Sequence, residues 1–377
     1  METSYKTTKE SSSSKRLDGV QIFRGLAAMA VLLYHINLQF TKFVPGTPDF
    51  NAAPWQWTIH RYGFLGVDFF FVLSGFIIYY IHRRDLGISK QGKTFLLKRF
   101  FRIQPLLWTI ILIKLAYLIL VSKESVEWME VVNTALTLPG IKMIGVAWTL
   151  TFEWMFYLFF LCCILGGRRW LWILGAIWGL LTVGASQIDQ QDWSQWLQVF
   201  SSPYVVLFLC GVVAAEAFNR WPGQLRFANF CIAPLVVILL LIGVTYAPFN
   251  LTPFQCRQVA IDMAYGRCFW GLTFGLLVWW AAVSDMRFRS WVFAPLLIIG
   301  NASYAIYLFH NEILQAFIRI GKALHIFQYG NVVLWMWIYA VAVLVAGIVI
   351  HFMIELPLLN WSRKFIIKGS DVTADKV

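Results

Sequence analysis

The chain has 377 residues, of which 59% are hydrophobic and only 13% are charged, and its formal net charge is +12. Soluble domains carry about 25% charged residues, so this composition excludes an ordinary soluble domain. A mean hydropathy of +0.66 and repeated apolar runs of about 20 residues predict an all-α, multi-pass membrane protein.

In chain order, a polar tail rich in serine and lysine comes first, at 1–18, and we expect it to be disordered, without a removable signal peptide. About ten transmembrane helices follow, at 19–40, 62–82, 100–121, 146–166, 169–187, 200–218, 229–247, 264–284, 294–318 and 332–356. We therefore expect one membrane domain over 19–360, then a basic cytoplasmic tail at 361–377. Glycines such as Gly66 and Gly75 in the second span predict close helix approach.

Positive charge alternates between the segments that connect these spans. The two tails and every second loop hold 21 lysines and arginines, whereas the opposite loops hold six. By the positive-inside rule, both termini are predicted to be cytoplasmic. The basic charge is thus explained by topology, so no nucleic-acid partner is expected.

Four titratable side chains from four different spans fall at a similar depth in the outer half of the predicted bundle: His35, Asp68, Glu153 and His310. An ionisable group in a bilayer costs at least about 2.5–3.5 kcal/mol, which makes these residues candidates for function. An imidazole beside a carboxylate suits general-base catalysis, because the carboxylate orients the ring. A local polar contact between helices is the alternative, and for Asp68 it is the favoured one.

A second group lies at the predicted inner face, where Arg24 is near the start of the first span and Arg99 and Arg102 are at the entry of the third. Guanidinium groups match the geometry of phosphate oxygens, so this cluster suits phosphate binding; topology alone is an equally strong explanation. Glu355 lies at the same face and is a candidate partner for one of the arginines.

Several kinds of site are not indicated. The six cysteines show no spacing typical of a metal site or a disulfide framework. The chain contains no G-x-S-x-G elbow, P-loop or dinucleotide fingerprint, so a serine hydrolase or a nucleotide-binding fold is not expected.

Six stretches, taken together and in this order, resemble the acyltransferase 3 family of bacterial integral-membrane O-acyltransferases, over residues 17 to 360. They are "LDGVQIFRGLAAMAVLLYH", "GFLGVDFFFVLSGFII", "KRFFRIQPL", "WTLTFEWMFY", "GNASYAIYLFH" and "IELPL". Arg24 and His35 fit the family's pattern of an arginine, ten residues and a histidine. Arg99 and Arg102 fit its R-x-x-R pattern.

The resemblance implies transfer of an acyl group, most often acetyl, from cytosolic acyl-CoA to a sugar hydroxyl at the outer face of the bacterial inner membrane. It implies an essential histidine, arginines tied to the acyl donor, acyl-CoA as co-substrate and no permanently bound cofactor. Some relatives carry a fused esterase-like domain. We expect this chain to be of the stand-alone type, whose members modify exopolysaccharides, O-antigens or lipid-linked saccharides.

The resulting hypothesis has His35 act as general base, or form an acyl-histidine intermediate, with Glu153 or Asp68 holding the second ring nitrogen. His310 assists or positions the acceptor, and Ser303 and Tyr304 are candidate oxyanion donors. Two alternatives stay open: a transporter or flippase for lipid-linked saccharides, in which the buried residues form a proton relay, and a non-catalytic scaffold of a glycan-assembly complex.

Overall fold

A computed structural model describes residues 17–48, 62–188, 190, 192–245, 259–284 and 291–371. Within these ranges the secondary structure is helical and contains no strand, which confirms the all-α prediction. Of the predicted tails, residues 1–16 and 372–377 lie outside the described residues. The first residues of the predicted C-terminal tail belong to a helix, α15.

The long helices are α1 (Asp18–Phe43), α3 (Leu65–His82), α4 (Lys90–Tyr117), α6 (Trp148–Gly166), α7 (Arg168–Ala185), α9 (Tyr204–Arg220), α11 (Ala233–Thr245), α12 (Val259–Val283), α13 (Ala294–Ala323), α14 (Val332–Ile350) and α15 (Leu356–Asp371). Short helices are α5 (Trp128–Ala135), α8 (Gln195–Phe200) and α10 (Leu225–Phe227). Three π-helical turns, η2 (Leu118–Ser122), η4 (Ala228–Ile232) and η9 (His351–Glu355), continue or precede the longer helices.

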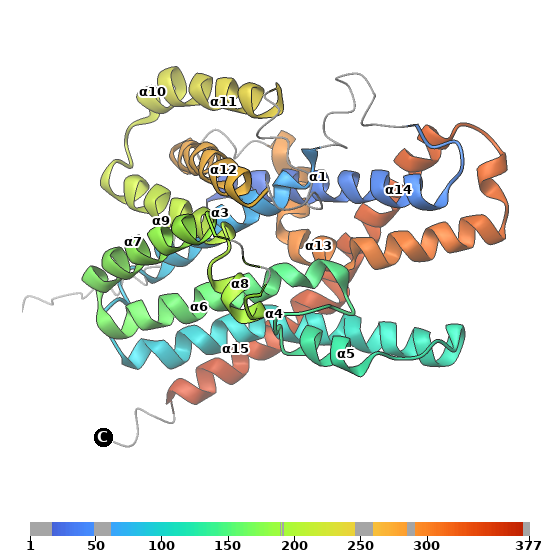
Figure 1. Ribbon diagram of the computed structural model, residues 1–377, viewed down its shortest axis with the longest axis horizontal. Helices are drawn as coiled ribbons and strands as arrows, with labels where there is room; N and C mark the ends of the chain where they lie inside the picture. The colour runs from blue at the N-terminus through green and yellow to red at the C-terminus, as the bar shows by residue number, and fades with distance from the viewer. Residues whose placement is uncertain are drawn as a thin grey trace, which may run out of the picture.

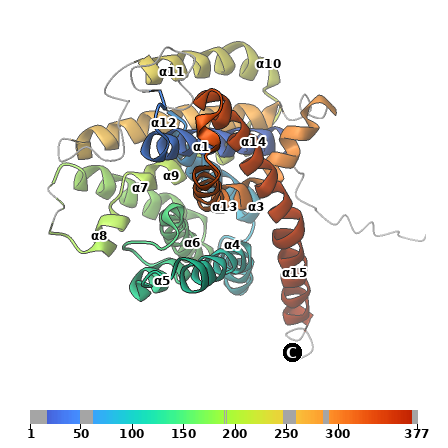
Figure 2. The same cartoon turned by 90° about the vertical axis from the view of Figure 1, so that its right-hand side faces the viewer.

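The helices form one bundle in which α1, α4 and α6 lie along a common direction (Figure 1). Helix α12 crosses that direction, as the view turned by 90° shows (Figure 2). Helix α14, the turn η9 and α15 follow one another without a break and run diagonally across the view toward the C-terminus (Figure 1).

In the described part of the chain, nine helical segments are long and apolar enough to cross a membrane, and each matches a predicted span. The remaining predicted span, 169–187, is helix α7, which packs against α6 and α9. Its two leading arginines and its tryptophans make it less apolar than the other nine. The chain is a multi-pass membrane protein; the cytoplasmic placement of both termini stays a prediction.

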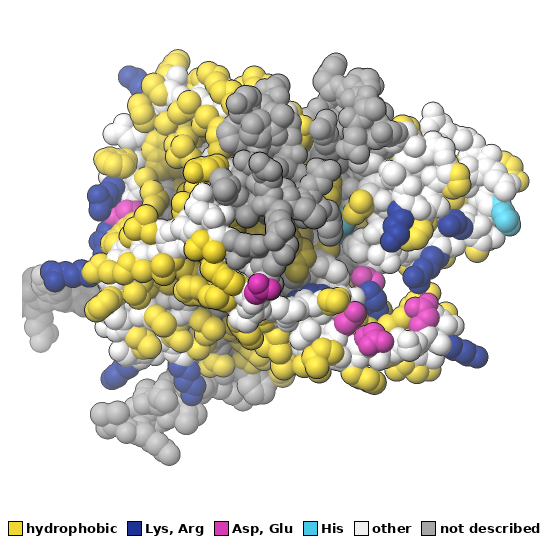
Figure 3. Space-filling view, in the orientation of Figure 1, with side chains coloured by type: hydrophobic (Ala, Val, Ile, Leu, Met, Phe, Trp, Pro, Cys, Tyr) yellow, Lys and Arg dark blue, Asp and Glu magenta, His cyan; other side chains and the backbone are white. Residues whose placement is uncertain are grey.

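The surface agrees with a lipid environment. On the face shown in Figure 3, apolar side chains cover much of the bundle, and most charged side chains lie toward its ends. Leu112 on α4 is 66% exposed and Leu180 on α7 is 74% exposed. Such side chains on the middle of long helices are stable against lipid tails but costly in water.

Glycines let the central helices pack backbone against backbone. A Cβ at Gly25 of α1 would lie 2.9 Å from the main-chain nitrogen of Gly300 on α13, and a Cβ at Gly300 would overlap the main-chain oxygen of Gln21. The predicted close approach in the second span is confirmed at Gly75, which faces the main chain of Phe208. Small residues at such crossings bring helices together, and the α1–α13 crossing determines the site described next.

Candidate active site

A pair of histidines lies at the α1–α13 interface. The rings of His35 and His310 are nearly perpendicular, with an interplanar angle of 74° and centroids 4.6 Å apart. The Nδ1 of His35 lies 2.9 Å from the carbonyl oxygen of Val31, and that of His310 lies 2.6 Å from the carbonyl oxygen of Tyr307. A carbonyl only accepts, so each neutral ring carries its proton on Nδ1 and leaves an Nε2 lone pair.

This differs from the expectation that Glu153 or Asp68 orients the catalytic imidazole. The main chain of each histidine's own helix performs that role. Asp68 instead accepts a hydrogen bond from Arg267 at 2.6 Å, with both side chains buried. Arg267 also donates to the hydroxyl of Tyr204 at 3.2 Å, so the ion pair joins α3, α12 and α9. Asp68 thus makes the local polar contact between helices that was favoured for it.

Arg267 is the partner of Asp68 that the sequence analysis did not assign. It lies alone in an apolar span, as Asp68 does, and two opposite charges buried in different spans are a signal for pairing.

Toward the N-terminal end of α1, a cavity of about 170 Å³ lies between α1, α3, α4, α6 and α13. We call it the arginine cavity; its polar lining includes Arg24, Arg99, Arg102, Glu153, Ser303 and Tyr304. The structure therefore brings together all three arginines predicted to bind the acyl donor. It also places Glu153 with them.

Glu153 is held within this cavity by hydroxyl groups. Its Oε1 accepts hydrogen bonds from Ser74 at 3.0 Å and from Tyr157, one turn along α6. It lines the cavity together with Arg24 and Arg99. Glu153 is thus the carboxylate that offsets positive charge in the cavity.

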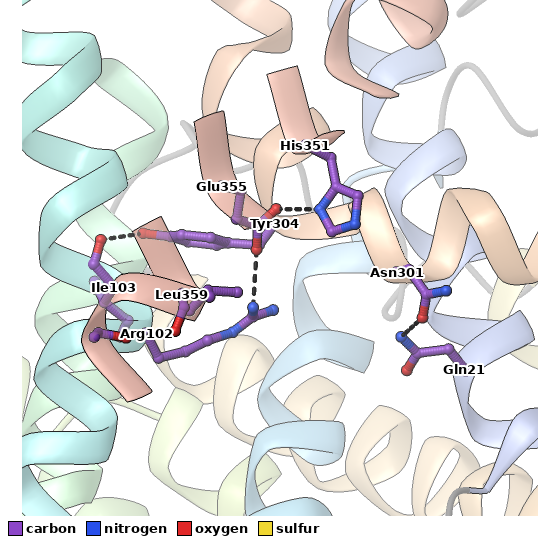
Figure 4. Close-up of polar contacts among 9 residues, drawn as sticks. Gln21, Arg102, Ile103, Asn301, Tyr304, His351, Glu355 and Leu359 are labelled. Carbon is purple, nitrogen blue, oxygen red and sulfur yellow. Dashed lines mark hydrogen bonds and ion pairs between the residues drawn. The ribbon is translucent and has the colours of Figure 1, made fainter. Parts of the chain in front are cut away.

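Arg102 is anchored by the expected partner. Glu355 accepts from Arg102 at 2.8 Å and lies 2.7 Å from Nδ1 of His351, as Figure 4 shows. The guanidinium of Arg102 also lies over the ring of Tyr304, 5.5 Å from its centroid. Both Glu355 and His351 belong to the π-helical turn η9, which precedes Pro357. Proline lacks the N–H that an α-helix would donate at this point, and π turns are frequent at functional sites.

Arg99 retains unused hydrogen-bonding capacity. Its guanidinium lies over the rings of Phe95 and Tyr157, and its buried Nε has no hydrogen-bond partner among the described residues. The buried Oγ of Ser303 is likewise without a partner in that part of the chain. Two buried polar atoms that line one cavity without partners indicate a ligand site, because such atoms are normally paired.

The arginine cavity and the histidine pair share two helices. Arg24 and His35 are eleven residues apart on α1, close to three full turns, so they lie on one face about 16 Å apart. On α13, Tyr307 lines the cavity, and its carbonyl holds His310 one turn further on. The Tyr307 hydroxyl contacts Thr149 at 3.0 Å and the carbonyl oxygen of Val146 at 3.1 Å. Tyr307, which sequence analysis did not single out, connects the two parts.

These features define a multi-pass membrane protein whose cation-lined cavity shares two helices with a pair of histidines that are held through Nδ1 by main-chain carbonyls. Residues 17–352 match the profile of the acyltransferase 3 family, described as an acyltransferase domain, and the chain belongs to that family. It is therefore an acyltransferase, as the sequence resemblance implied.

Two relatives are similar over most of this chain. The peptidoglycan O-acetyltransferase OatA of Listeria monocytogenes is 24% identical over 342 residues, which are 80% of this chain and 50% of the relative. The exopolysaccharide production protein ExoZ of Rhizobium meliloti is 25% identical over 331 residues, 83% of this chain and 95% of the relative. The chain thus spans about half the length of the first and nearly all of the second. No solved structure matches.

Proposed function

We propose that this chain transfers an acyl group, in the simplest case acetyl, from cytosolic acyl-CoA to a hydroxyl of a cell-surface or lipid-linked polysaccharide at the bacterial inner membrane. The observation that carries the proposal is the arrangement of the arginine cavity and the histidine pair along the same two helices. The names of the relatives support the acceptor class, since one refers to peptidoglycan O-acetylation and the other to exopolysaccharide production.

The arginine cavity suits the phosphates of acyl-CoA. Arg24 and Arg99 are half-buried and line the cavity, and an anionic ligand would pair with their charges. Guanidinium groups bind phosphate oxygens through two parallel hydrogen bonds, which a lysine cannot do. Arg102 is held by Glu355 and is 29% exposed, so an arriving ligand can reach it.

The apolar part of the lining suits the rest of the donor. Val67, Phe70 and Leu73 of α3 line the same cavity on the side toward the N-terminal end of that helix. An extended pantetheine arm anchored at the arginines would follow α1 and α13 past Tyr307 and carry the thioester toward His35.

The chemistry then follows from the histidine tautomer. The Nε2 lone pair of His35 accepts the proton of the sugar hydroxyl, and the hydroxyl oxygen bonds to the thioester carbonyl carbon. The carbon–sulfur bond breaks, and the CoA thiolate leaves and takes up the proton from the imidazolium. In an alternative route, Nε2 itself attacks and the acyl group passes through an acyl-histidine. In either route, His310 lies beside His35.

Ser303 and Tyr304 do not suit the oxyanion role that the sequence suggested. Seven residues separate Ser303 from His310, about 10 Å along α13, which is too far for both to act on one carbonyl. The hydroxyl of Tyr304 already donates to the carbonyl oxygen of Ile103 at 2.9 Å (Figure 4). We assign both residues to donor binding.

The experiment is mass spectrometry of surface polysaccharide from a bacterial strain without the gene, complemented with the unaltered chain or with His35→Ala. We expect the acetyl mass increment to return only with the unaltered chain, at equal protein levels in the membrane. Isolated membranes should consume acetyl-CoA in a His35-dependent manner, which a flippase would not do. Acetylation that persists with His35→Ala would refute the proposal.

A further inference from the structure

Two amide side chains bridge α1 and α13 next to the histidine pair, on the side away from the arginine cavity. Gln39 lies one turn after His35 on α1, and Asn311 directly follows His310 on α13. The Nε2 of Gln39 donates to the Oδ1 of Asn311 at 2.8 Å. Gln39 is 8% exposed and Asn311 is 9% exposed, so this amide pair is buried.

The amide pair leaves an acceptor unused. Oε1 of Gln39 is buried and has no hydrogen-bond partner in the described part of the chain, and the same holds for Nε2 of His310. A buried polar atom without a partner loses its hydrogen bonds to water and gains nothing in return, so such atoms are normally paired. Both atoms are acceptors: Oε1 of Gln39 is an amide oxygen, and Nε2 of His310 has a lone pair because Nδ1 carries the ring proton. Each requires a ligand that brings an O–H or N–H group.

We propose that Gln39 and Asn311 form the acceptor subsite. This subsite binds a second hydroxyl of the sugar ring, next to the hydroxyl that is acylated. The inference rests on the proposed function. The second hydroxyl donates to Oε1 of Gln39. The amide nitrogen of Asn311 donates to an oxygen of the same ring. A primary amide both donates and accepts, as a hydroxyl does, so the two groups are matched.

The position of the amide pair favours the acceptor over the acyl donor. Gln39 is four residues from the end of α1 at Phe43, about 6 Å along the axis, whereas Arg24 lies near the opposite end. A thioester offers an acceptor oxygen and no proton, so it cannot donate a hydrogen bond to Oε1 of Gln39. The unpaired Oε1 of Gln39 cannot stabilise an oxyanion either, since an oxyanion needs donated protons.

The test uses the full chain in lipid nanodiscs, radiolabelled acetyl-CoA, and oligosaccharide prepared from the polysaccharide of the strain without the gene. Gln39→Met keeps the side-chain length and removes the amide. We expect the KM for the oligosaccharide to rise about tenfold, as for one lost hydrogen bond, with acetyl-CoA affinity unchanged.

The matched control is Gln21→Met. Gln21 donates to Asn301 at 2.9 Å across the same two helices, near the arginine cavity (Figure 4). If Gln39 merely joined α1 to α13, both variants would have the same effect. We expect the KM for the oligosaccharide to stay within twofold of the original in Gln21→Met.

A second measurement needs no variant. An oligosaccharide that lacks the hydroxyl next to the acylated position should raise KM about tenfold with the unaltered chain, and it should raise KM no further in Gln39→Met. Unchanged KM in either measurement, or a fall in kcat alone, would overturn the inference. Such a result leaves the proposed function intact, which fails only if His35→Ala retains transfer.

Discussion

His35 and His310 stand with their ring centroids 4.6 Å apart, each bound through Nδ1 to a main-chain carbonyl of its own helix. Both rings therefore present Nε2 as an acceptor when neutral. Neither ring can donate a proton to the other through that atom, so the pair is complementary to a hydroxyl.

Replacing His35 by Gln should lower kcat for acyl transfer by about 10²- to 10⁴-fold, the usual contribution of a general base. Glutamine keeps a polar side chain of similar reach but does not accept a proton at neutral pH. Steady-state transfer from radiolabelled acetyl-CoA measures kcat, and donor affinity should stay within twofold. Equal losses of donor affinity and kcat would contradict a role confined to the chemical step.

Arg99→Ala and Arg102→Ala should each raise the KM for acetyl-CoA by about 10- to 100-fold, because each removes charge-assisted hydrogen bonds. The KM for the oligosaccharide should not change. Lys98→Ala is the matched control, since Lys98 is an exposed cation on the same helix that does not line the cavity. An equal effect of Lys98→Ala would point to general surface charge instead of a specific site.

Asp68→Asn should destabilise the chain by about 3–5 kcal/mol, because Arg267 is left as a buried cation without its carboxylate. The double replacement of Asp68 by Leu and Arg267 by Met should be much milder than either single change. Unfolding in mixed detergent micelles measures both. If transfer per folded molecule is lost in the double variant, Asp68 acts in catalysis after all.

Gly300→Ala should push α13 away from the main chain of Gln21 on α1 and so separate the histidines. We expect lower thermal stability and a fall in kcat. Gly184→Ala in α7 is the control, since nothing lies within 4 Å of its Cβ position. That change should be neutral or stabilise the helix by up to about 1 kcal/mol. A harmless Gly300→Ala would show that the crossing tolerates a wider spacing.

Hydropathy and loop charge predicted the spans, because the length of an apolar run is a local property of the sequence. Depth along a span could also be read, and it correctly placed His35 and His310 at one level. Which side chains meet between neighbouring helices could not be read from the sequence, since it depends on how each helix is rotated about its axis. Asp68 therefore faces Arg267, and Glu153 faces the arginines, although both share a predicted depth with the histidines.

Uncharged residues were missed for a different reason. Tyr307, Gln39 and Asn311 carry no charge, so a search for ionisable residues in apolar spans passed over them. Only the neighbours that they contact show their importance. Glu355, by contrast, could be paired with the arginines in advance, because a carboxylate at that depth needs a cation.

Helix α1 also fixes the distance between two residues of the candidate site. Arg24 and His35 share one face of a continuous helix, about three helical turns apart. In the mechanism that we propose, this separation sets the distance between the donor's phosphates and His35. One residue inserted between them would rotate the imidazole by about 100° and move it by about 1.5 Å. In the same mechanism, this helix selects the donor by the length of its arm as well as by its acyl group.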